Sequence, residues 1–317
     1  MTDDKAWQAN QGNRGRLAGL TVVIIATLFS AFTLVQEKAS LAEDKDIPIS
    51  TSESSAGFNP QFWYLPDEPL LGFVEIPAGE FLMGSDPAID KNAYENERWS
   101  NRSRRGRVSV ATFYISRFET TVAQYKIFVQ TTHHPVAGNV LSGDGNLPIT
   151  GVTLPDALAY CRWLEIQLKN NENISEELSD KLSQGWRVTL PTEAQWEKAA
   201  RGRNGKIYPW GNQATTTFAN FRSDHLRPVG SKACDSCEYE LADMSGNAWE
   251  MTRSFYLPYP FDGGVLPDTD SDALFVMRGG SYTDNDVNVR AAVRGGVDPG
   301  ARNDAIGFRI VMSPPKH

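Results

Sequence analysis

Cysteine and histidine, which most often bind transition metals, are scarce in this sequence: 3 of 317 residues are cysteine and 4 are histidine. The last cysteine is Cys237, so the chain contains no thiol beyond that position. Only His133 and His134 are close in sequence, and adjacent residues on an extended strand point to opposite faces. These absences argue against a histidine-bound iron site and against a thiolate site in the C-terminal part.

Positive charge is also in the minority. Lysine and arginine total 31 against 39 aspartate and glutamate residues, a net charge of −8 at pH 7, so no nucleic-acid partner is expected. The sequence contains no internal repeat that we can find. Most of the 26 glycines and 18 prolines fall after residue 70, between short apolar runs. This distribution of glycine and proline predicts a loop-rich α+β domain rather than a helical bundle.

One long apolar run stands near the N-terminus. Residues 17–35 carry no charged side chain. This run of 19 residues is long enough to cross a bilayer as a helix. Basic residues precede the run and Glu37 follows it, which predicts a cytoplasmic tail over 1–16 and an exported remainder. The alternative is a signal peptide cleaved after Ala42. Residues 36–70 are interpreted as a linker and 71–314 as the folded domain.

Export affects how the cysteines are interpreted. The expected location is the bacterial inner membrane with a periplasmic domain, or the periplasm itself if the signal is cleaved. Cys234 and Cys237 form a C-x-x-C pair, which alone is half a zinc site. In an exported chain a local disulfide is favoured over free thiols and over a redox or metal role. Cys161 lies in a helical pattern and is expected to be a buried apolar residue.

Capping signals predict two of the helices. Thr120 or Thr121 can begin a helix that carries apolar residues at helical spacing. Thr192 is a natural N-cap, with Gln195 in place to complete a capping box. Alternating apolar residues on both sides of Pro77-Ala78-Gly79 predict a hairpin over residues 73–83.

The stretch of residues 241–251, LADMSGNAWEM, places two carboxylates, Asp243 and Glu250, around a small polar turn. Gly246 permits a tight reversal, which turns successive backbone carbonyls inward between the carboxylates. Six to eight oxygens, some of them from the backbone, are what a calcium ion prefers. A plain surface turn between strands is the alternative.

Several motifs together resemble the formylglycine-generating enzyme (sulfatase-modifying factor) superfamily. They include the turn just described, the run RVTLPTEAQWEKAARG over residues 187–202, and the C-terminal RGGSY and GFRIV segments. The resemblance covers about residues 72–312. It implies the compact, loop-rich α+β fold of that family, related to C-type lectins. Here that fold is preceded by one N-terminal transmembrane or signal helix.

The resemblance also implies calcium as a structural cofactor. Carried over by position, the ligands are the side chains of Asp243 and Glu250 and the carbonyls of Gly246 and Ala248. A second family calcium site uses an Asn side chain and the next carbonyl, which match Asn220 and Phe221. The distal acidic ligand of that second site has no clear counterpart, and Asp224 is only within reach.

This chain lacks the cysteine ligands that the family's copper chemistry requires. Formylglycine-generating enzymes bind copper(I) through two cysteines that follow RGGSY, where thiolates suit a soft ion. Asp284 stands at the first of these positions and Val289 near the second. The related sulfoxide synthases of ergothioneine biosynthesis bind iron through three histidines in a spacing that this chain does not contain. Neither copper nor iron is expected.

Ser281, Tyr282, Asp284 and Arg294 are candidates for lining a groove that still binds a peptide, with Arg294 clamping a carboxylate. A salt-bridged polar loop system is the alternative for the same segment. We therefore predict an exported, membrane-tethered, calcium-stabilised domain that binds a peptide or protein ligand and does not form formylglycine. An oxidase of peptides, similar to the family members that mature pyoverdine, is the second hypothesis. A true formylglycine-generating enzyme is the third.

Overall fold

The computed structural model describes residues 57–100, 104–260 and 273–315, all within one compact unit, Ser50–His317. The predicted N-terminal tail, membrane span and cleavage site lie outside the described residues. Within these ranges no helix is both long enough and apolar enough to cross a membrane.

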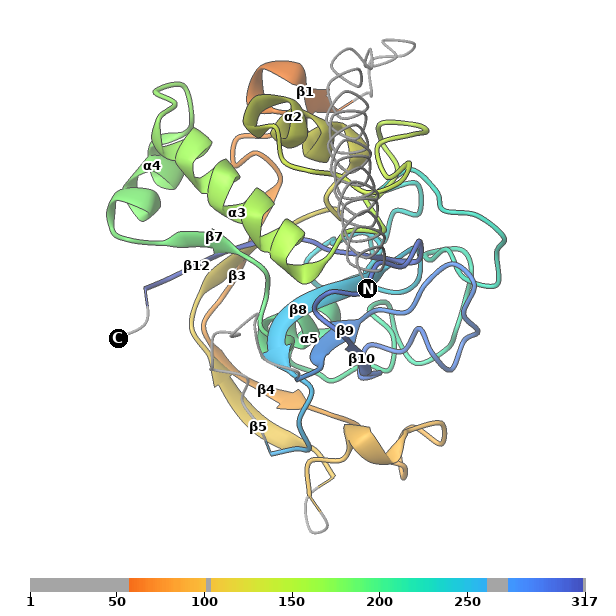
Figure 1. Cartoon of the computed structure of the whole chain (residues 1–317). Helices are drawn as coiled ribbons and strands as arrows, with labels where there is room; N and C mark the ends of the chain where they lie inside the picture. Colours follow the sequence, from red (N-terminus) through yellow and green to blue (C-terminus); the bar gives the residue numbers. More distant parts are fainter. Residues whose placement is uncertain (1–56, 101–103, 261–272, 316–317) are drawn as a thin grey trace, which may run out of the picture. The chain divides into compact units, whose positions relative to one another are not determined.

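Two four-stranded sheets form the framework (Figure 1). The first is antiparallel throughout, in the order β3 (Phe73–Ile76), β6 (Phe113–Ser116), β12 (Val311–Ser313) and β7 (Arg187–Thr189). The second is mixed, with β11 parallel to β8, in the order β10 (Gly295–Val297), β9 (Phe275–Arg278), β8 (Trp249–Phe255) and β11 (Ile306–Gly307). Two short ribbons complete the strands, β1 (Phe58–Asn59) with β2 (Leu65–Pro66), and β4 (Gly79–Met83) with β5 (Gly106–Val110).

In the part of the chain that the structure describes, four α-helices begin where the sequence supplies a capping side chain. They are α2 (Val122–Thr132), α3 (Leu154–Lys169), α4 (Glu176–Ser183) and α5 (Glu193–Arg201). Thr121 and Thr192 each accept a hydrogen bond from the backbone three residues on, and a glutamine returns the bond, so both predicted N-caps are confirmed. Thr153 forms the same capping box at α3. Two 3-10 turns, η2 (Pro60–Phe62) and η3 (Glu95–Glu97), lie in the connections.

The expected hairpin over residues 73–83 is wrong. Strand β3 pairs with β6 and strand β4 pairs with β5, so the turn at Pro77-Ala78 passes the chain from a sheet to a separate ribbon. The folded unit also includes residues 57–70, which the sequence analysis assigned to a linker. Leu65 is buried in the main core, and the carbonyl of Tyr64 accepts a hydrogen bond from Gln124 of α2.

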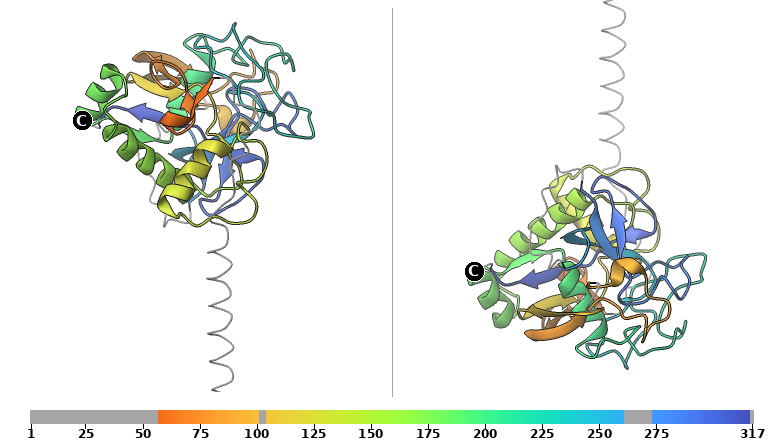
Figure 2. Two further views of the ribbon diagram at one scale, coloured as in Figure 1. Left: turned by 90° about the horizontal axis from the view of Figure 1, so that it is seen from above. Right: turned by 90° about the horizontal axis from the view of Figure 1, so that it is seen from below.

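The main hydrophobic core lies between α2, α3 and the two sheets, and it is rich in aromatic rings from both helices. Helix α3 lies beside β7, and α5 packs against β8, β9 and the β4–β5 ribbon. Figures 1 and 2 show α3 and α4 on one side of this unit and the irregular loops of residues 203–248 on the opposite side. The predicted site residues from 220 to 250 therefore gather on the loop side.

Candidate functional site

The turn at residues 243–250 is tied to the segment that carries the second predicted calcium site. Asn247 donates its backbone N–H to the carbonyl of Asn220 over 2.8 Å, and the two side chains share a hydrogen bond of 3.0 Å. Gly246 has φ +79, and a Cβ at that position would lie 2.3 Å from the Asn220 carbonyl oxygen. Glycine is required there by both backbone conformation and space. The structure thus brings the two predicted segments together.

Glu250 is already engaged by protein donors. Both of its carboxylate oxygens accept hydrogen bonds from the guanidinium of Arg309, at 2.6 and 2.7 Å, and the indole N–H of Trp196 donates to it over 2.6 Å. All three side chains are buried. Glu250 therefore anchors β8 to the C-terminal segment, whether or not it also binds a cation.

Glu119 is a third buried carboxylate at this turn, and it is not among the site residues predicted from the sequence. It accepts hydrogen bonds from the side chain of Asn247 and the backbone N–H of Ala248, at 2.7 and 3.0 Å. Burial, followed by the charges of Asp243 and Glu250, raises its pKa well above the usual value. Its sequence context, the E-T-T run before α2, gives no sign of burial, so only the fold could reveal it.

The charge balance of this turn suits a divalent cation. Three buried carboxylates, those of Glu119, Asp243 and Glu250, act electrostatically on a single guanidinium, that of Arg309. Burial raises the pKa of Asp243 to about 6, although Gly230 donates its N–H to that carboxylate. An ion bound by oxygens would compensate the excess negative charge.

The backbone would have to supply part of such a site. Within the described ranges, no group of three or more His, Cys, Asp or Glu side chains could by itself hold a metal ion. A cation at the turn therefore depends on carbonyls such as those of Gly246 and Ala248, as the sequence predicts. Asp243 has the freer carboxylate, because the oxygens of Glu250 already bind Arg309 and Trp196. The residues fit calcium in charge and donor type, and the ligand set stays a prediction.

The second predicted calcium site has a different electrostatic setting. Asn220 and Phe221 line an open hollow of about 510 Å³, together with Arg222, Arg227 and Lys232. Asp224, the nearest acidic candidate, is exposed and contacts His225. Three cationic side chains around the hollow favour an anionic ligand over a calcium ion. The second calcium site likewise stays a prediction.

Asp284 holds together the segment that follows RGGSY. One of its carboxylate oxygens accepts from the backbone N–H of Ser281, the hydroxyl of Ser281 and the indole N–H of Trp249, at 2.8–2.9 Å. The other accepts from Asn288 over 2.9 Å. The backbone of the neighbouring Tyr282 donates to the carbonyl of Asn247, so the segment sits directly on the predicted calcium turn. Ser281, Tyr282 and Asp284 are therefore brought together.

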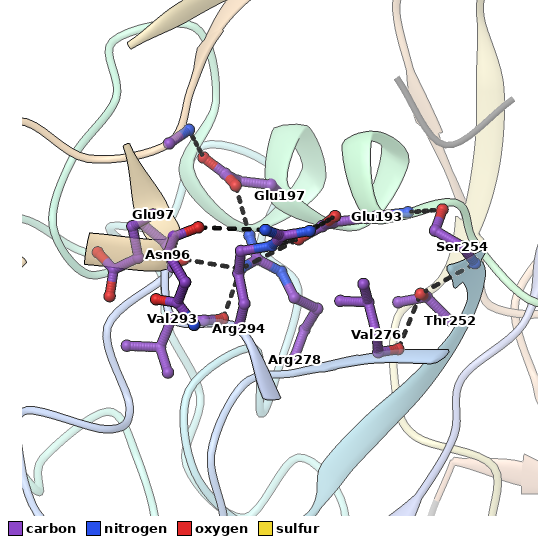
Figure 3. Close-up of polar contacts among 12 residues, drawn as sticks. Asn96, Glu97, Glu193, Glu197, Thr252, Ser254, Val276, Arg278, Val293 and Arg294 are labelled. Carbon is purple, nitrogen blue, oxygen red and sulfur yellow. Dashed lines mark hydrogen bonds and ion pairs between the residues drawn. The ribbon is translucent and has the colours of Figure 1, made fainter. Parts of the chain in front are cut away.

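Arg294 is not part of that group, which corrects its assignment to the groove. Its guanidinium is buried and donates two hydrogen bonds to Glu193 at the start of α5, at 2.5 and 2.9 Å (Figure 3). It also donates to the carbonyls of Asn96 and Leu257. These acceptors leave it no role in clamping a ligand, and for Arg294 the salt-bridged alternative is the correct one.

Buried ion pairs extend beyond Arg294. Arg278 donates to Glu197 and to the carbonyl of Val293 (Figure 3). It also donates to the carbonyls of Ala291 and Ala292. Arg290 binds Glu97 through two hydrogen bonds, at 2.7 and 2.8 Å, and Asp90 through one of 2.6 Å. From its sequence, the charged stretch of residues 86–107 is expected to be a solvated loop. Two of its carboxylates, Asp90 and Glu97, are instead buried and paired with Arg290, about 200 positions away.

The remaining cysteines and histidines occupy separate places. Cys234 and Cys237 are joined in a disulfide in the loop before the turn, and Cys161 is a buried free thiol in α3. His134 contacts Asp156 over 2.8 Å, whereas His133 is exposed at the end of α2.

Comparison with known proteins identifies the family of the domain that carries the turn and the RGGSY segment. A family model described as the sulfatase-modifying factor enzyme 1-like domain matches residues 64–314. The chain belongs to this family. Its α+β fold is confirmed by the solved structure of PvdO from Pseudomonas aeruginosa. That structure has a TM-score of 0.62 at 22% identity and covers 76% of this chain and 94% of its own.

The names of curated relatives in this family indicate that some are enzymes and others are inactive. The mouse protein named inactive C-alpha-formylglycine-generating enzyme 2 is 33% identical over 186 residues, which cover 53% of this chain and 49% of the mouse protein. The formylglycine-generating enzyme of Streptomyces coelicolor is 29% identical over 298 residues, which cover 75% of this chain and 88% of that enzyme. The chain spans about half the length of the mouse protein and of several other curated relatives.

Proposed function

We propose that this chain is a calcium-stabilised binding domain of the sulfatase-modifying factor family that does not form formylglycine by a copper mechanism. One observation carries the proposal. Asp284 stands where the family resemblance assigns the first copper-binding cysteine, and both its oxygens are occupied by donors from the protein. No cysteine follows Cys237 in the sequence, so the residues present do not fit copper(I).

The ligand we infer is an acidic segment of a peptide or protein. The hollow beside Asn220 supports this, because Arg222, Arg227 and Lys232 line it. It also adjoins the RGGSY segment, since the backbone N–H groups of Arg222 and Ser223 donate to the carbonyls of Asp284 and Tyr282. A surface of this charge attracts carboxylate-bearing partners.

The first test is the metal content of the purified full-length chain, measured by mass spectrometry with and without a calcium chelator. We expect about one or two calcium ions per chain, no stoichiometric copper or iron, and a lower melting temperature after chelation. Loss of bound calcium in Asp243→Asn would locate the ion at the turn. Absence of calcium from the untreated protein would refute the calcium part of the proposal.

The second test measures catalysis directly. The chain is loaded with copper(I) and incubated with a cysteine-containing peptide, while oxygen consumption and the mass of the peptide are followed. The Streptomyces coelicolor formylglycine-generating enzyme is the positive control. We expect neither oxygen uptake nor modified peptide. Oxygen-dependent modification of the peptide would overturn the binding-domain proposal and would favour an enzyme instead; a formylglycine product would indicate a formylglycine-generating enzyme.

We also propose that the domain works outside the cytoplasm of a bacterial cell, held by the apolar run of residues 17–35. Mass spectrometry of the protein recovered from cells separates the two forms, since cleavage after Ala42 removes that run and releases the domain. Recovery of the intact domain from the cytoplasmic fraction would contradict export.

A further inference from the structure

Arg253, on β8, differs from every other arginine that is buried in the described residues. Each of the others forms an ion pair with a carboxylate: Arg201 and Arg278 with Glu197, Arg290 with Glu97 and Asp90, Arg294 with Glu193, and Arg309 with Glu250. Arg253 is 8% exposed and has no ion pair within the described ranges. Burying a charge without a counter-ion costs free energy, so an anionic partner is expected for the Arg253 guanidinium.

The protein gives Arg253 only neutral acceptors. Its Nε–H donates to the carbonyl of Leu190 over 2.9 Å, and Nη2 reaches the side-chain oxygen of Gln195 over 3.4 Å. Burial lowers the pKa of Arg253 to about 10, and the thiol of Cys161 is the group that acts in the opposite direction. These contacts orient the guanidinium but do not neutralise it.

A cavity of about 520 Å³ opens beside this guanidinium. It is lined by residues of α3, β7 and β8 and by the chain at the end of β12. Figures 1 and 2 show α3 on the side of this unit opposite the loops of residues 203–248. Arg162 and Arg187 line it as well, and Leu158, Val188 and Pro314 give it apolar walls. Its volume falls in the range of small-molecule sites.

The net charge of the side chains near the cavity is positive even when the neighbouring Glu165 is counted. Glu165 contacts Arg187 over 2.8 Å, but it also binds Lys169 over 2.7 Å and the backbone N–H of Val188. Its charge is therefore shared between two cations, which leaves Arg162 and Arg253 for a ligand.

We propose that this cavity binds a small organic oxyanion, with Arg253 as the buried counter-ion and Arg162 and Arg187 at the rim. Guanidinium groups recognise carboxylate and phosphate through paired hydrogen bonds, and both oxyanions fit this description. The apolar walls favour a ligand whose anionic group is attached to a hydrophobic body. The site is independent of the RGGSY segment and of the calcium turn.

The test uses the full-length chain and 4-fluorobenzoate, whose ¹⁹F resonance broadens when the molecule binds. We expect binding to the wild-type protein, and a loss of affinity of about 10-fold or more in Arg253→Met, because a charge-assisted hydrogen-bond pair is removed. Arg162→Met, at the exposed rim, should weaken binding less. Inorganic phosphate added to the complex then separates the two ligand chemistries: displacement shows recognition of oxyanions in general, and its absence shows a carboxylate site.

Arg107→Met is the matched control, because Arg107 on β5 is exposed and lines neither the cavity nor the basic hollow, so its loss should leave the affinity unchanged. The melting temperature of Arg253→Met without ligand shows whether the variant is folded, and replacing a buried unpaired charge by an apolar side chain should not lower it. If that variant fails to fold, Arg253→Lys and Arg162→Met carry the test. Absence of binding to the wild-type protein at millimolar probe, or full affinity in Arg253→Met, would overturn the proposal.

Discussion

Replacing Arg290 by methionine should destabilise the protein far more than replacing the exposed arginine Arg222. Arg290 and Glu97 are both completely buried, and Asp90 is nearly so. The change leaves two carboxylates without their cation, and breaking a buried ion pair from one side typically costs about 3–5 kcal/mol. For a domain of this size we expect a decrease in melting temperature of about 6–20 °C.

The assay is guanidinium denaturation followed by tryptophan fluorescence, with thermal unfolding as a second measurement. Arg222→Met is the control: Arg222 pairs with Asp286 over 2.7 Å, but its side chain is 61% exposed, so a loss of at most about 1 kcal/mol is expected. Adding Glu97→Gln to Arg290→Met should recover part of the loss, because it removes one of the unpaired charges. Equal effects of the two arginine substitutions would refute the argument that burial makes the Arg290 network strong.

Three further predictions concern the turn and a helix cap. Gly246→Ala should lower the free energy of unfolding by more than about 1 kcal/mol, measured by denaturant titration, because a Cβ would collide with the Asn220 carbonyl at positive φ. Thr192→Ala should cost about 1 kcal/mol in the same assay through loss of the α5 cap, and Thr192→Ser should cost little. Burial raises the pKa of Asp243 from 3.8 to about 6, so the native state binds its proton more tightly than the unfolded chain. Without calcium, the free energy of unfolding should therefore fall as pH rises from about 4 to about 6, and Asp243→Asn should show a smaller fall.

Local sequence signals predicted local structure well. The caps at Thr121 and Thr192 were found because a capping box depends on residues only three positions apart. The family motifs indicated the fold, which the family model and the PvdO structure confirm. The predicted hairpin failed because alternation shows that a segment is a strand but does not identify its partner. Val74 pairs with Ile115, which no pattern around Val74 could show.

The buried charges could not be read from the sequence for a related reason. Asp90 and Glu97 occur in a stretch crowded with charged residues, and such stretches are usually solvated. Their burial depends on Arg290, which comes from a distant segment. Arg253 poses the opposite problem, since it lies on a strand whose residues are mostly buried, and only the fold shows that no carboxylate of the described residues pairs with it.

Asp284 explains how the protein's own side chains hold the RGGSY segment in shape. Four hydrogen bonds converge on its carboxylate, from Ser281, Trp249 and Asn288, so this one side chain fixes the turn and attaches it to β8. A thiol is a weaker acceptor and could not hold the same donors. Val289, near the second cysteine position of the family, is completely buried in an apolar cluster and leaves no polar group aimed at a metal. The residues at both positions thus hold the segment in shape, so binding sites are better sought in the basic hollow, where cationic side chains outnumber the acidic one, and in the Arg253 cavity.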